Sequence, residues 1–207
     1  MEGLTVAGRA LAYRLAAPFY DFAMAGVLAS ARRDSVASID LRPGQRLLLV
    51  GIGTGLDLPW LPRNLDIVGG DLVPEMLRRA ELRRRNQGLD RLSLLNLDAQ
   101  ALPFPDASFD AVLLHLILAV APDGRAVLAE ACRVLRPGGR IAVLDKFLAP
   151  GSTRIPLWRR GAQLLMHPFT DFNRRFEELA EGLPLELRSD QGVMLGRTFR
   201  RILLQRR

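Results

Sequence analysis

Three glycines spaced two residues apart, Gly51, Gly53 and Gly55, follow directly after the apolar run 46–50. Glycine tolerates positive φ angles and lets backbone amides approach a ligand, and open α/β sheets bind ligands at the carboxyl ends of their strands. Asp71 stands twenty residues after Gly51, at the end of the next apolar run. A carboxylate there can accept both hydroxyl protons of a ribose, so the spacing predicts a nucleoside-binding site.

The same pattern disfavours other kinds of site. A dinucleotide-binding loop has glycine at the position of Leu56, which leaves a nicotinamide cofactor as a minor alternative. A P-loop is excluded because no Gly-Lys pair followed by Ser or Thr is present. One cysteine, Cys132, and two distant histidines, His115 and His167, do not make a zinc-ligand cluster, so we expect no metal.

The elements that must position these residues alternate between short apolar runs and helical stretches, as in βαβ units around a parallel sheet. We expect helices from Pro74 to about residue 86, ending at Gly88, and from Asp123 onward, with a short helical piece at 56–61. A turn at 137–139 precedes the fifth strand. Strands are expected at 46–50, 67–71, 92–97, 109–118 (the central one), 140–146 and, closing one edge, at 185–188 and 198–204.

Length and composition set the class of protein. The chain has 207 residues, 49% of them hydrophobic and 25% charged, which fits one folded domain and excludes a disordered chain. The longest uncharged apolar stretch, 111–122, is too short to cross a membrane, and the N-terminus lacks the layout of a signal peptide. We therefore expect a cytoplasmic protein. The net charge of +7 is concentrated in residues 151–207, which carry 11 basic and 6 acidic side chains.

The chain resembles the class I S-adenosylmethionine-dependent methyltransferases, in the group that includes ubiquinone/menaquinone methyltransferases and bacterial phosphatidylethanolamine N-methyltransferases. The resemblance extends from about Tyr13 to Lys146. It rests on five segments in the family's order: GIGTG at 51–55, GDLVPEML at 70–77, DAQALPF at 98–104, FDAV at 109–112 and RVLRPGG at 133–139. The resemblance implies a Rossmann-like α/β fold with a seven-stranded, mostly parallel sheet and helices on both faces.

The resemblance also implies S-adenosylmethionine as the cofactor and S-adenosylhomocysteine as the product. Asp71 would bind the ribose hydroxyls, and the glycine loop would pass under the methionine part. Asp98 would accept a hydrogen bond from the adenine amino group beside the Ala99 amide, while Leu72 and Met76 would pack against the adenine ring. The implied cofactor-binding residues are thus Gly51, Gly53, Gly55, Asp57, Asp71, Leu72, Met76, Asp98 and Ala99.

Asp57 is included because of one departure from the family. An acidic residue usually stands two residues before the first glycine and helps to hold the methionine end of the cofactor, whereas this chain has Leu49 there. Asp57 is the candidate to replace it. The departure also keeps open a non-catalytic protein that binds S-adenosylmethionine.

Three residues are catalytic candidates. Methyl transfer from a sulfonium is an in-line displacement, which needs alignment and, for a protonated nucleophile, a group that removes a proton. His115 lies just past the expected central strand and suits a general base, with a hydrogen-bonded structural histidine as the alternative. Tyr20 and Asp21 are the other candidates, because the N-terminal helices of this family cover the cofactor with a tyrosine-containing segment.

The expected acceptor is a lipid. The segments 17–21 and 51–59 are similar to those of phosphatidylethanolamine N-methyltransferases, which favours the amine of that lipid, and the runner-up is C-methylation of a prenylated quinol. We expect residues 1–45 to cover the cofactor site, 46–150 to form the binding core, and 151–207 to supply a basic amphipathic insertion and edge strands, all within one structural domain. The insertion, 151–180, could lie on an anionic membrane surface or close over the active site. Nucleic acid is not expected, since no aromatic platform accompanies the arginines.

Overall fold

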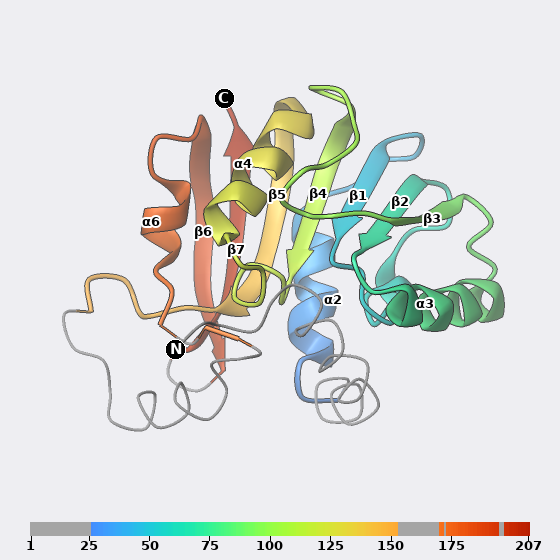
Figure 1. Cartoon of the computed structure of the whole chain (residues 1–207), viewed down its shortest axis with the longest axis horizontal. Helices are drawn as coiled ribbons and strands as arrows, with labels where there is room; N and C mark the ends of the chain where they lie inside the picture. Colours follow the sequence, from blue (N-terminus) through green and yellow to red (C-terminus); the bar gives the residue numbers. More distant parts are fainter. Residues whose placement is uncertain (1–25, 153–169, 172, 195–196) are drawn as a thin grey trace.

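The computed structural model of the chain describes residues 26–152, 170–171, 173–194 and 197–207, and Figure 1 draws them in colour. They form a seven-stranded sheet in the order β3-β2-β1-β4-β5-β7-β6. The first five strands run parallel, while β7 is antiparallel to both β5 and β6. The strands are β1 (Arg46–Val50), β2 (Asp66–Asp71), β3 (Leu92–Asn96), β4 (Phe109–His115), β5 (Leu135–Lys146), β6 (Leu185–Met194) and β7 (Phe199–Arg206).

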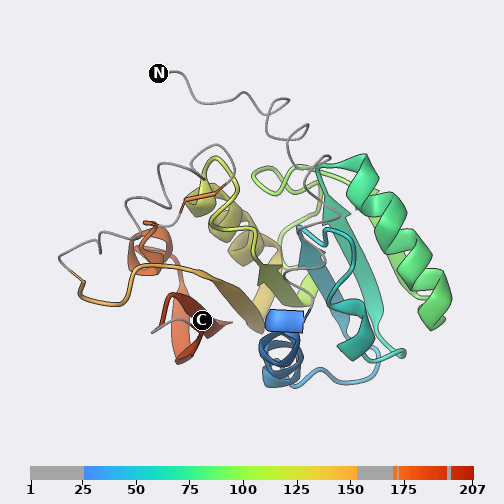
Figure 2. The same cartoon turned by 90° about the horizontal axis from the view of Figure 1, so that it is seen from below.

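Helices cover both faces of the sheet, as the sequence predicted. One core joins α4 (Gly124–Val134) and α6 (Phe176–Ala180) to one face, through side chains such as Leu48, Val127 and Phe176. The other core joins α2 (Ala29–Ser38), the 3-10 turn η1 (Leu58–Trp60) and α3 (Pro74–Gln87) to the opposite face. Figure 2 shows the sheet between α4 and α2.

Most element predictions are confirmed. The strand 109–118 is the central one, although it ends at His115 because Leu116 takes a left-handed backbone with φ +60°. The first predicted helix begins at Pro74 and ends before Gly88, whose φ of +63° is the left-handed conformation that closes many helices. The second begins after Asp123, whose side chain accepts a hydrogen bond from the Ala126 amide.

The start of the fifth strand was predicted wrongly. The turn residues 137–139 were expected to separate a helix from a strand that begins at Arg140, but β5 already begins at Leu135. Leu135 pairs with Phe109 and Arg140 pairs with Ala111, so two steps along β4 face five along β5. The glycines therefore form a bulge within the strand, with Gly138 at φ +78°.

Within the described residues, no helix is both long and apolar enough to cross a membrane.

Candidate active site

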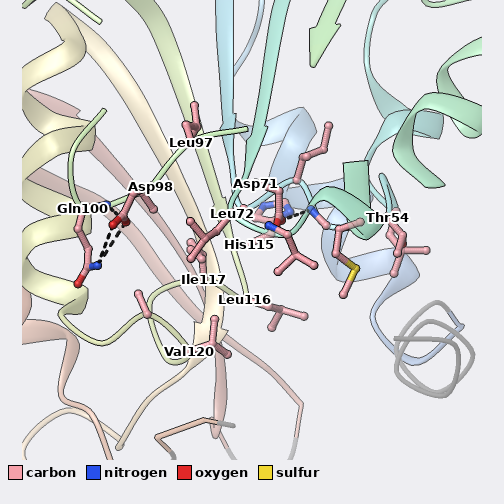
Figure 3. Close-up of a pocket in the computed structure, with 18 of the residues that line it drawn as sticks. Thr54, Asp71, Leu72, Leu97, Asp98, Gln100, His115, Leu116, Ile117 and Val120 are labelled. Atoms are coloured by element: carbon pink, nitrogen blue, oxygen red, sulfur yellow. Dashed lines mark hydrogen bonds between the residues drawn. The ribbon is translucent and has the colours of Figure 1, made fainter. Parts of the chain in front are cut away.

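A pocket opens at the carboxyl ends of the parallel strands, where the sequence placed the site (Figure 3). Its wall is built from the loop after β1, the ends of β2 and β3, and the segment after β4. Parallel strands present these ends along one edge, which is why residues from 51 to 122 in the sequence meet here.

The glycine loop is the floor of this pocket. Gly51, Gly53 and Gly55 have φ angles of +71°, +56° and +84°, which other residues rarely adopt. A side chain at Gly51 would approach Ile117 to 2.9 Å, whereas a side chain at Gly53 would meet no atom of the described residues within 4 Å. Within the described part of the chain, the missing side chain at Gly53 thus leaves the backbone accessible to a ligand.

Asp71 ends β2 and lies against this loop. Its carboxylate accepts hydrogen bonds from the backbone amides of Gly53 at 2.8 Å and Val73 at 2.9 Å (Figure 3). Burial raises the pKa of Asp71, and the amides of Val73, Gly53 and Leu72 oppose that rise. Each carboxylate oxygen has two lone pairs, so both can accept a further hydrogen bond from a ligand hydroxyl.

The far end of the pocket is mostly apolar, with the carboxylate of Asp98 and the amide of Gln100 as its polar groups. Leu72, Met76, Leu97 and Ala99 line it, and Leu72 is 42% exposed. Asp98 accepts a hydrogen bond from the Gln100 backbone amide at 2.9 Å and weaker ones from its side-chain amide (Figure 3). This combination suits a flat heteroaromatic ring with an amino group.

The opposite end contains a buried polar network that the sequence did not reveal as a unit. Asp57 accepts two hydrogen bonds from Arg32 Nη1, both at 2.9 Å, and one from His115 Nδ1 at 2.8 Å. His115 Nε2 is hydrogen-bonded to Ser35 Oγ at 2.9 Å. Arg32 and Ser35 lie one turn apart on α2, and both are buried. Arg32 and His115 line the pocket.

Charge explains how Asp57 is kept ionised in this network. Burial alone would raise the pKa of Asp57, but the attraction of His115 and Arg32 outweighs burial and holds the pKa well below its usual range. An ionised carboxylate only accepts hydrogen bonds, so the proton between Asp57 and His115 belongs to Nδ1. In a neutral ring, Nε2 would then accept from the Ser35 hydroxyl.

The segment after β4 forms an apolar rim. Leu116, Ile117 and Val120 point their side chains along the pocket (Figure 3). Asp145 fixes this segment by accepting from the Ala119 amide at 2.9 Å, and Arg174 fixes it by donating to the carbonyls of residues 118, 121 and 122.

Residues 48–143 match the family described as "Methyltransferase domain". The strands β1 to β4 and most of β5 lie within or overlap this segment. It has the fold of a class I methyltransferase domain.

Similar proteins include a phosphatidylethanolamine N-methyltransferase of Cereibacter sphaeroides, 38% identical over 129 residues that cover 62% of this chain and 63% of that protein. A demethylmenaquinone methyltransferase of Clavibacter sepedonicus is 39% identical over 124 residues, which cover 59% of this chain and 48% of that protein. The matches thus span less than two thirds of these relatives. The crystal structure of geranyl diphosphate C-methyltransferase from Streptomyces coelicolor A3(2), solved with S-adenosyl-L-homocysteine, has a TM-score of 0.73 at 15% identity, covering 86% of this chain and 76% of that one.

The cofactor expected for this methyltransferase domain is S-adenosylmethionine, and the pocket residues fit it. The open backbone at Gly53, the free lone pairs of Asp71 and the exposed Leu72 are each suited to a nucleoside with an amino-acid tail.

The structure brings together most of the residues singled out from the sequence. Gly51, Gly53, Asp71, Leu72, Met76, Asp98, Ala99 and His115 line the pocket of the methyltransferase domain, while Gly55 supports the glycine loop from behind, against Leu58. Asp57 lies behind His115 and is not part of the lining. Tyr20 and Asp21 lie outside the described residues.

Arg32, Ser35 and Gln100 were missed by sequence reasoning. Arg32 and Ser35 belong to no recognisable sequence motif. Only their three-residue spacing could have suggested that they share one face of a helix. Across the described ranges, no cluster of three His, Cys, Asp or Glu side chains could hold a metal ion.

Proposed function

We propose that this chain transfers a methyl group from S-adenosylmethionine to the amine of phosphatidylethanolamine or a similar lipid. The observation that carries the proposal is the 38% identity to a phosphatidylethanolamine N-methyltransferase over 129 residues, which are 62% of this chain. Because the match covers 63% of that relative, the acceptor is inferred from the shared domain and from the pocket wall.

In this proposal the cofactor lies along the pocket with its two ends in different surroundings. Asp71 accepts the ribose hydroxyls, and the ring lies between Leu72 and Ala99 with its amino group toward Asp98. The methionine part crosses the glycine loop toward Arg32 and His115.

The transfer itself needs little from the protein beyond alignment. The lone pair of the acceptor nitrogen forms the new N–C bond while the C–S bond breaks, and that electron pair stays on sulfur. A proton then leaves the methylated nitrogen. Both ring nitrogens of His115 are already hydrogen-bonded, to Asp57 and to Ser35, which favours the structural alternative for this histidine. Tyr20 and Asp21 remain candidates for the acceptor side.

The apolar rim after β4 supports a lipid-like acceptor. Leu116, Ile117, Val120, Ala121 and Pro122 present an apolar wall at the end of the central strand. Such a wall suits alkyl chains better than a charged small molecule, because burying an unpaired charge against it would be costly.

A prenylated quinol is the second candidate acceptor. The 39% identity to a demethylmenaquinone methyltransferase favours it, and the same apolar wall would accommodate its tail.

Transfer of radiolabelled methyl from S-adenosylmethionine into a total bacterial membrane extract separates the two candidates. Label in the phospholipid headgroup supports the proposal, and label confined to the quinone fraction replaces it with the runner-up. The Asp71→Ala variant serves as the control that should transfer none. Cofactor binding without label in any fraction would indicate a non-catalytic binding protein or a soluble acceptor.

The proposal also assigns the basic segment 151–180 to an anionic membrane surface. Residues 153–169 lie outside the described residues, and Arg174 is bonded to the pocket rim and therefore does not belong to such a surface. Sedimentation with vesicles rich in phosphatidylglycerol tests the remainder. The double variant Arg159→Glu/Arg160→Glu should bind less than the wild-type protein, and equal binding would remove the membrane surface from the proposal.

A further inference from the structure

The end of the pocket near the glycine loop presents a cation. Arg32 is 5% exposed and lines the pocket beside Gly51, Gly53 and His115. Its Nε is buried and has no hydrogen-bond partner among the described residues, while its bonds to Asp57 both come from Nη1. A guanidinium has five N–H donors, so Arg32 retains donors for a ligand.

Asp57, the carboxylate that pairs with Arg32, lies on the same face of the sheet as the buried side chain of Leu49. Leu49 pairs with Leu113, and His115 follows two residues later on β4, so the side chains of 49, 113 and 115 point to the same face. Asp57 contacts His115 on that face. The carboxylate on this face is thus that of Asp57, and it already accepts hydrogen bonds from the guanidinium of Arg32 and the imidazole of His115.

The methionine end of the cofactor would therefore meet a positive charge, that of Arg32, in place of the acidic residue that the family resemblance led us to expect at position 49. Leu49 is 2% exposed within an apolar cluster and supplies no acceptor for the amino group. Asp57 is enclosed behind Arg32 and His115. Of the charged side chains that line the pocket, Asp71 and Asp98 are assigned to the ribose and the adenine, which leaves the guanidinium of Arg32 for the methionine part. A guanidinium is a donor, which suits the carboxylate of an amino acid and not its ammonium.

We propose that Arg32 binds the carboxylate of the methionine part of the cofactor, with Asp57 as the positioning residue that orients the guanidinium. A planar guanidinium held by a second carboxylate is well suited to receive one more, because its geometry is fixed before binding. This inference rests on S-adenosylmethionine as the cofactor and is independent of which acceptor is methylated.

Calorimetry with two ligands tests the assignment. S-Adenosylhomocysteine and its decarboxylated analogue differ only in the carboxylate. Wild-type protein should bind the first roughly 10- to 150-fold more tightly, the range expected for one charged hydrogen-bonded contact. In Arg32→Gln the ratio should fall to near one, mainly through weaker binding of S-adenosylhomocysteine.

Arg140→Gln is the matched control. Arg140 donates a hydrogen bond from Nη1 to the carbonyl of Ile39, just after α2, and it does not line this pocket. Its ligand ratio should equal that of the wild-type protein. Should Arg32→Gln fail to fold, Arg32→Gln/Asp57→Asn replaces it, since that pair leaves no unpaired carboxylate.

A wild-type ratio near one would overturn the assignment, as would an unchanged ratio in the Arg32 variants. Failure to methylate any lipid would leave both ligand ratios untouched, so the two proposals fail separately.

Discussion

The buried pair of Arg32 and Asp57 leads to the sharpest stability prediction. Both side chains are 6% exposed, and Asp57 accepts three hydrogen bonds of 2.8–2.9 Å from Arg32 and His115. Replacing Asp57 with alanine leaves a buried guanidinium without its counter-charge. Breaking a buried pair in this way typically costs about 3–5 kcal/mol, because the remaining charge stays desolvated.

That loss is large relative to the whole stability of a domain, which is about 5–15 kcal/mol. For a chain of this size each kcal/mol corresponds to about 2–4 °C in Tm, so Asp57→Ala should lower Tm by roughly 6–20 °C. Thermal and urea unfolding, followed by circular dichroism, measure the effect directly.

Asp66→Ala is the matched control. Asp66 pairs with Arg91 at 2.6 Å, but both side chains are about half exposed, and exposed pairs contribute about 0–1 kcal/mol. A loss below about 1 kcal/mol for Asp57→Ala, or equal losses for the two variants, would refute the role of the buried network.

The pH dependence follows from the lowered pKa of Asp57. A carboxyl whose folded pKa lies below its unfolded value of about 3.9 stabilises the fold above that pH, and the contribution is lost as the pH falls toward the folded pKa. The stability gap between wild type and Asp57→Ala should therefore be constant near neutral pH and shrink below about pH 4. A gap that widens under acid would contradict this assignment.

The pocket leads to two further predictions. In Gly55→Ala the new Cβ would approach Leu58 to 2.9 Å, so urea unfolding should show a loss of stability larger than the strain of a left-handed alanine, about 1–2 kcal/mol. Gly44 has a similar φ and no atom of the described residues near its Cβ position, so Gly44→Ala should show the strain alone. Equal losses would contradict the close packing behind the loop. Leu72→Ala should weaken the binding of S-adenosylhomocysteine in calorimetry by about fivefold and leave Tm unchanged. Leu82 is exposed outside the pocket, so Leu82→Ala should change neither the affinity nor Tm. Equal affinities would remove Leu72 from the adenine site.

The sheet was largely predictable because apolar runs and their flanking turn residues are local signals. Strand β1 follows from 46–50 alone, and α3 from Pro74 at its start and Gly88 at its end. The bulge at 137–139 was not predictable, since the same Pro-Gly-Gly sequence serves a turn or a bulge, and only pairing with β4 decides between them.

The glycine loop and Asp71 were predictable for a similar reason, because consecutive βα units place them at one edge. The network at the other end was not. Arg32 and Asp57 are 25 residues apart, and Ser35 and His115 are 80 apart, on elements that meet only in the folded chain. Asp57 illustrates the difference: the sequence singled it out for the cofactor, while the structure shows its carboxylate bonded to protein groups.

Calorimetric titration of S-adenosylhomocysteine into wild-type protein and Asp71→Ala measures whether Asp71 holds the cofactor. We expect one site per chain in the wild-type protein. In the variant the affinity should fall roughly 100-fold or more, because two charged hydrogen bonds to the ribose, worth about 1.5–3 kcal/mol each, are removed. No binding to the wild-type protein, or equal affinity for the two proteins, would contradict a cofactor pocket built on Asp71.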